Sequence, residues 1–396
     1  MGLDASLRRH WTLDPQVAYL NHGSFGACPQ PVLEVQAALR ARMEREPVAF
    51  FQRDLEGLLD DARAAVARFV GADPQGLAFV ANATHAVNAV LASLDLKPGD
   101  VLLTTDHAYR ACHNALRRWA ERAGARVETV AVPFPLKDPT QVEAAVLAAV
   151  GPRTRLALLD HVTSPTGLAF PVERLVPALR QRGVETLVDG AHVPGMLALD
   201  IDRLGAGYYV ANLHKWVCAP KGAGFLHVRA DLRPGTHPAV TSHGWSLERP
   251  GRSRFRLEFD WTGTDDPSAA LSAPAAIAFM EQALPGGWAE VRRRNHQLAL
   301  AGRDALCRAL GVEKPAPDEM LGSMAAVPLP DATVSLDDRG VDPLHEALRR
   351  EDGIQVPITP WPAWPRRLIR ISAQLYNAPE EYERLATALA RRLAPQ

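Results

Sequence analysis

The chain has 396 residues, of which 47% are hydrophobic and 22% are charged, a composition typical of globular proteins. The formal net charge is −1, which gives no sign of a nucleic-acid or membrane-surface partner. No apolar run approaches the roughly 20 residues of a membrane helix, and residues 1–15 lack the apolar core of a signal peptide. Four widely spaced cysteines, with no CxxC, predict neither a zinc site nor a disulfide framework, and a cytoplasmic location.

Short apolar runs alternate with amphipathic stretches through the first two thirds of the chain. The runs that we predict as strands are 77–81, 101–105, 127–132, 156–160, 186–189, 208–211 and 224–228. The predicted helices are 85–94, 109–123, 141–149 and 172–182. Near-continuous hydrophobicity is typical of strands that are buried on both faces. The pattern predicts a doubly wound, mostly parallel seven-stranded α/β sheet, and it disfavours a (β/α)8 barrel because the last strands arrive without helices between them.

The pattern changes after about residue 266. Long helices are predicted over 267–284 and 288–311, and shorter helices over 343–351 and 379–393. Short strands are predicted over 327–329, 333–336 and 368–372. We therefore predict a large domain of residues 16–265 and a smaller α+β domain of residues 266–396, which residues 1–15 join.

Lysines are rare in this chain, which narrows any search for lysine chemistry. Only five occur among the 44 basic residues. Lys97, Lys137 and Lys314 lie in proline-containing turn sequences that are typical of solvated positions. Lys215 instead follows an apolar run and lies between His and Trp (NLHKW), with Lys221 as its one rival. A lysine that such neighbours desolvate has a lowered pKa and can form a Schiff base.

Two other strand ends carry polar groups. Asp189 ends the strand 186–189, at the edge where open α/β sheets bind ligands, although it could also be an ordinary turn residue. The sequence NATH at 82–85 follows the strand 77–81 and opens a helix, so it is either a phosphate site or a plain helix cap. A phosphate cradle, a carboxylate for a ring nitrogen and a lysine together are what pyridoxal phosphate requires. We therefore predict this cofactor and no metal.

Several motifs along the chain resemble one known family. They are 19–26 (YLNHGSFG), 160–167 (DHVTSPTG), 189–192 (DGAH), 212–216 (NLHKW), 261–264 (WTGT), 352–357 (DGIQVP), 370–372 (RIS) and 376–377 (YN). These motifs resemble the class V branch of the fold-type I pyridoxal phosphate enzymes, in particular the isopenicillin N epimerase-like proteins. The branch is also similar to the C–S lyases of ergothioneine synthesis. The resemblance covers essentially the whole chain from about residue 19.

The resemblance implies a role for each matching residue. Lys215 is the expected Schiff-base lysine, and Asp189 is the expected partner of the pyridine nitrogen. The other cofactor contacts that it implies are Ala83, Thr84 and His214 at the phosphate, Ser164 and His192 near the ring, Asn212 in place of the usual Ser or Thr, and Thr264 reaching the phosphate of the neighbouring subunit. The implied substrate contacts are Asn21, His22 and the carboxylate-binding Arg370. One of His107 and Tyr109 is expected to stack on the ring opposite Lys215, and the sequence does not choose between them.

The resemblance also implies an enzyme that acts at Cα or Cβ of a small α-amino acid, as a homodimer with shared active sites. Epimerisation is the first prediction, and an acid opposite Lys215, where His107 or Tyr109 is expected, favours epimerisation or C–S elimination over transamination. β-Elimination that breaks a C–S bond and class V transamination are the alternatives. Outside the enzymes, the alternative is a cofactor-binding regulator or an inactive relative. A cysteine desulfurase is not expected, because residues 351–358, where those relatives carry their reactive thiolate, contain no cysteine.

Overall fold

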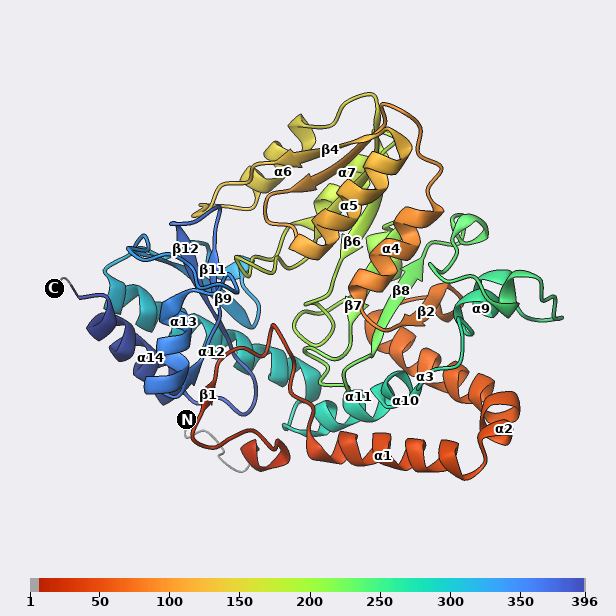
Figure 1. The fold of residues 1–396 in the computed structure, drawn as a ribbon, viewed down its shortest axis with the longest axis horizontal. Coiled ribbons are helices and arrows are strands. Elements are labelled where there is room, and N and C mark those ends of the chain that lie inside the picture. Colours follow the sequence, from red (N-terminus) through yellow and green to blue (C-terminus); the bar gives the residue numbers. More distant parts are fainter. Residues whose placement is uncertain (1–6, 395–396) are drawn as a thin grey trace.

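A seven-stranded sheet forms the centre of the computed structural model, which describes residues 7–394 (Figure 1). The strand order is β2-β8-β7-β6-β5-β3-β4. The strands are β2 (Leu77–Val80), β3 (Val101–Thr105), β4 (Arg126–Val130), β5 (Thr154–Asp160), β6 (Glu185–Asp189), β7 (Tyr208–Asn212) and β8 (Gly224–Val228). Strand β8 is antiparallel to its neighbours β2 and β7, and the other pairs are parallel. The predicted mostly parallel seven-stranded sheet is therefore confirmed.

Both faces of this sheet are buried, as the continuous hydrophobic runs predicted. Along β5, Leu156 and Leu158 pack into the core beneath α4 (Ala83–Ser93) and α5 (Arg110–Ala123). The alternate residues Ala157 and Leu159 pack into the core that includes α6 (Thr140–Ala148) and α7 (Val172–Arg180). Successive side chains of a strand point to opposite faces, so one strand serves both layers of helices. The carboxyl ends of β5, β6 and β7 are left at one edge for polar residues.

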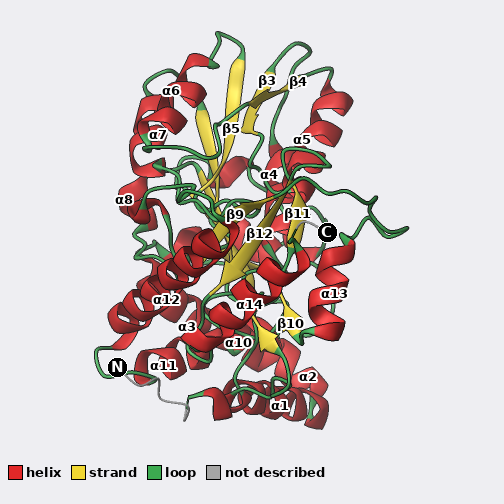
Figure 2. Ribbon diagram, turned by 90° about the vertical axis from the view of Figure 1, so that its left-hand side faces the viewer, coloured by secondary structure: helices red, strands yellow, loops and turns green. Residues whose placement is uncertain are grey.

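A second, smaller sheet lies in the C-terminal part (Figure 2). Its antiparallel order is β11-β12-β9, and a separate parallel pair joins β1 to β10. The bounds are β1 (Ala18–Tyr19), β9 (Met324–Leu329), β10 (Ile354–Gln355), β11 (Ile358–Pro360) and β12 (Arg367–Ser372). The helices here are α12 (Gly287–Leu310), α13 (Pro343–Glu351) and α14 (Pro379–Arg392). Through β1, the N-terminal segment packs on the C-terminal part of the chain.

Before residue 77 the sequence predicted only an exposed Arg-rich helix around Arg45 and Arg53, without bounds, yet this whole region is largely helical. It contains α1 (Gln30–Arg45), α2 (Pro47–Ala49), a π-helical turn (Phe50–Asp54) and α3 (Leu55–Val70). Helix α1 buries little besides Val32 and Gln36. A helix with so few buried positions shows a weak apolar stripe, which explains why the pattern was missed. Within residues 7–394, no helix is long and apolar enough to cross a membrane.

Two predictions in the C-terminal third are wrong. Residues 333–336 form no strand: they lie in a loop, where Val334 is 57% exposed and no neighbouring strand pairs with them. The helix predicted over 267–284 is two helices, α10 (Ser268–Leu271) and α11 (Ala273–Gln282). Pro274 lies in the first turn of α11, where its missing N–H and its ring end the preceding helix. The other predicted elements match the observed bounds to within about three residues.

Candidate active site

Lys215 lies in the connection between β7 and β8, at the carboxyl edge of the large sheet. Its Nζ is 3.1 Å from Nε2 of His192. Trp216 Nε1 donates to Nδ1 of His192 over 3.3 Å. Because an indole nitrogen can only donate, Nδ1 is the acceptor and Nε2 carries the proton of the neutral imidazole. Burial, reinforced by Lys215, lowers the His192 pKa well below its ordinary value. Neutral His192 therefore presents its Nε2–H to the amine of Lys215.

Burial lowers the pKa of Lys215 to about 8, against an opposing attraction from Asp189. A lysine reacts with an aldehyde only as the neutral amine. The rate at which pyridoxal phosphate combines with the protein is therefore expected to rise about tenfold per pH unit below that pKa and to level off above it. Stopped-flow absorbance would measure this rate, with Nα-acetyl-lysine as the control. A rate that keeps climbing toward the ordinary lysine pKa of 10.5 would contradict the prediction.

Asp189 ends β6 as the sequence predicted, and it is buried. Its Oδ1 accepts a hydrogen bond from the Ala191 N–H over 2.9 Å, and its Oδ2 accepts one from the Cys112 thiol over 3.3 Å. Burial raises the pKa of Asp189, while these two donors and Lys215 lower it. A buried carboxylate with two donors suits a cationic ring nitrogen, which would complete its set of partners.

The start of α4 offers donors for a phosphate. The Ala83 N–H donates to Oδ1 of Asn212 over 2.9 Å, and the His85 N–H donates to Oδ1 of Asn82 over 3.1 Å. The N–H and hydroxyl of Thr84 make no hydrogen bond with the residues that the structure describes, so they are available to an anion at this helix start. The side chain of Asn212 thus binds the backbone N–H of Ala83, a residue that was predicted to contact the phosphate.

His214 lies beside Lys215, and its Nδ1–H donates to the Ala223 carbonyl over 3.1 Å. This bond leaves Nε2 as the nitrogen that can face a phosphate. Burial, with Lys215 as the next cause, lowers the pKa of His214 to about 4. A dianionic phosphate against Nε2 would raise that pKa, because an adjacent negative charge favours the protonated imidazole.

Arg370, on β12, is only 6% exposed. Its Nη1 donates to the carbonyl and to Oγ of Ser164, the latter over 3.1 Å, and its Nη2 donates to Oγ of Ser24 over 2.8 Å. Its Nε is buried with no hydrogen-bond partner among residues 7–394, and no carboxylate of that part pairs with it. Burial lowers the Arg370 pKa to about 10. A buried guanidinium with no counter-charge is suited to bind an anion.

The structure separates His107 from Tyr109. His107 is fully buried: its Nε2–H donates to the Val132 carbonyl over 3.0 Å, and its Nδ1 accepts from the Thr166 hydroxyl over 2.7 Å. Its ring also packs edge-on against Trp361, with the centroids 4.8 Å apart. Tyr109 precedes α5, is 46% exposed and lies close enough to Arg370 to influence its pKa. Both nitrogens of His107 are thus used within the protein, whereas the Tyr109 side chain is free to meet a ligand.

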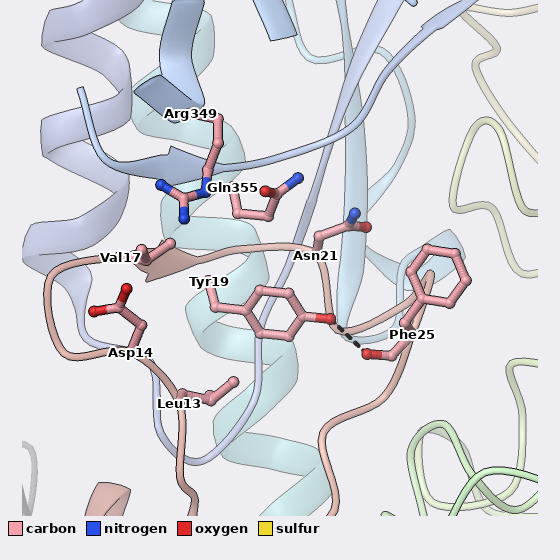
Figure 3. Close-up of a pocket in the computed structure, with 8 residues that line it drawn as sticks. All are labelled: Leu13, Asp14, Val17, Tyr19, Asn21, Phe25, Arg349 and Gln355. Carbon is pink, nitrogen blue, oxygen red and sulfur yellow. Dashed lines mark hydrogen bonds between the residues drawn. The ribbon is translucent and has the colours of Figure 1, made fainter. Parts of the chain in front are cut away.

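The two N-terminal candidates also differ. His22 is fully buried, with Nδ1 2.8 Å from the Tyr376 hydroxyl and Nε2 3.0 Å from the Lys215 carbonyl oxygen, so it braces the lysine loop. Asn21 lines a pocket of about 290 Å³, beside Tyr19 (Figure 3). Its Oδ1 is buried without a hydrogen-bond partner in the described part of the chain.

Thr264 is exposed, and it lines a different cavity, of about 580 Å³, with residues of the helical region 47–59. Sequence reasoning also missed several residues that the structure brings to the site. Ser24 lay within a quoted motif but had no assigned role. Asp160 ended a predicted strand and opened the quoted motif 160–167, but it had no assigned role. Cys112 gave no signal of its own, because its contact with Asp189 arises only from the packing of α5 on the sheet.

Comparison with known proteins agrees with this geometry. The model of the family described as "Aminotransferase class-V" matches residues 29–385. The chain belongs to the class V aminotransferase family. It is 37% identical to the isopenicillin N epimerase of Streptomyces clavuligerus, over 96% of both chains. It is 34% identical to a putative L-cysteine desulfhydrase 2 of Oryza sativa subsp. japonica, over 99% of this chain and 88% of that one. The family predicted from the sequence is confirmed.

Solved structures show the same fold at lower identity. A cysteine desulfurase from Thermococcus onnurineus NA1 superposes with a TM-score of 0.81 at 20% identity, over 99% of this chain and 98% of that one. The cystine C–S lyase C-DES, in complex with cysteine persulfide, superposes with a TM-score of 0.77 at 24% identity, over 95% and 98%. The fold is thus that of the fold-type I enzymes, and the class V enzyme uses pyridoxal phosphate, which fits the lysine, carboxylate and helix start described above.

Proposed function

We propose that this class V enzyme is an amino-acid epimerase. One observation carries the proposal: the guanidinium of Arg370, which has no carboxylate partner in residues 7–394, is close enough to interact electrostatically with both Lys215 and Tyr109, two groups that can move a proton. A substrate held at Arg370 by its carboxylate would then present its Cα between them. Pyridoxal phosphate, when bound, supplies the electron sink that makes the Cα proton acidic.

Each residue of the site has a separate role in the proposed reaction. Arg370 binds the substrate carboxylate through its planar fork, which fixes the orientation of Cα. The Lys215 amine, neutral near its lowered pKa of about 8, takes the Cα proton from one face. The Tyr109 hydroxyl returns a proton to the other face. His192 holds its N–H beside the Lys215 amine, and Asp189 holds the ring nitrogen.

The same site supports a second candidate function, C–S bond elimination. Among the relatives are two proteins named as putative L-cysteine desulfhydrases, at 34% identity, and a phenol beside Cα can protonate a leaving sulfur as well as a carbon. A cysteine desulfurase is not proposed, because the four cysteines are all buried. These four thiols are free, which supports the cytoplasmic location included in this proposal.

Incubation with a panel of amino acids and cysteine S-conjugates in deuterated buffer would distinguish these functions. We expect deuterium at Cα together with inversion of configuration, measured by mass spectrometry and chiral chromatography. Pyruvate and a released thiol would instead establish C–S elimination. Stoichiometric keto acid with aminated cofactor would establish transamination, and either result would overturn the epimerase proposal.

Replacing Arg370 by alanine is expected to lower kcat/KM for free amino acids about 30- to 1000-fold, because a charge-assisted bidentate contact is lost. Steady-state kinetics would measure this. The matched control is a substrate amide, which lacks the carboxylate and is expected to react equally with the parent enzyme and Arg370→Ala. Unchanged kinetics of Arg370→Ala on free amino acids would contradict the carboxylate role.

We also propose a homodimer in which Thr264 serves the partner's phosphate site. In support, Thr264 is exposed beside an apolar cavity in which Val48 and Leu247 are also exposed. Lys215→Ala and Thr264→Glu should each be inactive alone, since glutamate repels the phosphate. Mixed after reversible dissociation, they should regain about a quarter of the parent activity, because a mixed dimer has one intact site. Light scattering that shows an active monomer, or a mixture that stays inactive, would contradict the shared site.

A further inference from the structure

Two carboxyl groups end neighbouring strands directly beside the lysine loop. Asp160 is the last residue of β5 and Asp189 the last residue of β6, and the two are register partners in this parallel pair. Neighbouring strands lie about 4.8 Å apart, and register partners project from the same face. Both residues are nearly inaccessible, at 2% and 3% exposed. The two carboxyl groups therefore stand side by side in a buried place.

The hydrogen bonds of the two groups are unequal. Asp189 accepts from the Ala191 N–H and from the thiol of Cys112, a residue of α5. Asp160 faces the backbone N–H of Tyr109, but its Oδ2 is buried with no hydrogen-bond partner in residues 7–394. Two adjacent buried carboxylates cannot both carry a charge. Asp189 accepts two hydrogen bonds, so the proton belongs on Asp160, where Oδ2 becomes an O–H donor whose neighbouring acceptor is the carboxylate of its register partner Asp189.

The third acid of this cluster also stays neutral. Burial, reinforced by the negative charge of Asp189, raises the pKa of the Cys112 thiol well above its ordinary value. Cys112 is therefore an S–H donor throughout the working pH range. The other titratable groups that face the cluster are Lys215 from the β7–β8 connection and Tyr209 from β7, whose hydroxyl lies 3.0 Å from Nδ1 of His161.

We propose that Asp160 and Cys112 are positioning residues that act through Asp189. Because both are neutral acids, Asp189 is the one charged carboxylate of the cluster. Their hydrogen bonds determine how strongly Asp189 binds the pyridine nitrogen. The inference rests on the cofactor position assigned to Asp189, and it holds whether the reaction is epimerisation or elimination. Loss of the Asp160 O–H or of the Cys112 S–H leaves more negative charge on Asp189. That charge favours protonation of the pyridine nitrogen and of the nitrogen that joins the cofactor to Lys215.

The pH at which the visible absorption of the bound cofactor changes tests the role of Asp160. In the holoenzyme, Asp160→Leu is expected to move this transition up by about half a unit to one unit of pH, because a donor is lost. Asp160→Asn should leave it unchanged, since the amide N–H replaces the carboxyl O–H. A downward shift in Asp160→Asn would mean that Asp160 carries the charge, and identical behaviour of parent, Leu and Asn would mean that it does not act on Asp189. Either result overturns the proposal.

An infrared difference spectrum gives a second measurement that does not depend on turnover. The parent holoenzyme minus Asp160→Asn should show the C=O stretch of a protonated carboxyl group at neutral pH. Absence of that band would overturn the assignment of the proton to Asp160.

The thiol is tested in the same way with its own pair of variants. Cys112→Ala should raise the transition pH, and Cys112→Ser, which keeps a donor, should restore the parent value. Cys307→Ala is the control, because it removes a thiol of α12 that bonds only to the Glu313 carbonyl. A Cys112→Ala enzyme that titrates like the parent would overturn the thiol's part. If the variants shift the transition pH as expected but the parent enzyme does not invert amino acids, only the epimerase proposal is overturned.

Discussion

Alanine at position 215 is expected to abolish both the visible absorption of bound pyridoxal phosphate and all turnover. Lys215 is the lysine whose amine is buried beside His192 and near Asp189, so no other amine can take its place. Lys215 both binds the cofactor covalently and carries the proton. Loss of one acid–base group typically lowers the rate about 10²–10⁴-fold, so we expect a loss at or beyond the upper end of that range. Absorbance spectra and single-turnover kinetics would measure the two losses.

Lys221 provides the matched control, because it lies in the same connection between β7 and β8 but is exposed. Lys221→Ala should keep the absorption and the activity of the parent. A Lys215→Ala protein that remains yellow and active would show that the cofactor is held by a different lysine.

The parts of the site that could be predicted from the sequence are those that the common direction of the parallel strands brings together. Parallel strands place their carboxyl ends at one edge, so Asp189 at the end of β6 and Lys215 just after β7 had to be neighbours. The start of α4 follows β2 at that edge for the same reason. The predicted Arg370 comes from the other sheet, and the motif resemblance, rather than any periodicity, singled it out.

The environment of each histidine could not be predicted in this way. His22 lies in the quoted motif 19–26 and His107 was a candidate to stack on the ring, yet the structure uses all four of their nitrogens in internal contacts. Whether a histidine faces a ligand or the core depends on packing by distant segments, such as the loop that carries Trp361 against His107. Residue type and motif position say nothing of that packing.

The same limit explains the errors in the fold. A run such as 333–336 has strand-forming residues, but a strand needs a partner, and no strand of the small sheet pairs with these residues. In the helical region before residue 77, α1 buries only Val32 and Gln36 and therefore gives a weak periodic signal, whereas α3 buries seven positions and was overlooked despite its pattern.

Phenylalanine at position 109 is expected to reduce inversion about 10²–10⁴-fold, the range typical for loss of one general acid. Lys215 is untouched by this change, so proton exchange on its own face should continue. The structure supports Tyr109 for this role because its side chain is 46% exposed and lies near Arg370, where the substrate carboxylate is proposed to bind. In deuterated buffer, the variant should incorporate deuterium at Cα with retention of configuration, as measured by mass spectrometry and chiral chromatography.

His107→Phe is the comparison that separates the two candidates. Because both ring nitrogens of His107 are engaged by Val132 and Thr166, its loss removes no free acid from the site. We expect His107→Phe to change the inversion rate and the Lys215-face exchange rate by the same factor, as a packing defect would. Tyr109→Phe should instead change the ratio of the two rates. If Tyr109→Phe inverts at the parent rate while His107→Phe loses inversion selectively, the second acid is His107 and the assignment made from the buried contacts is wrong.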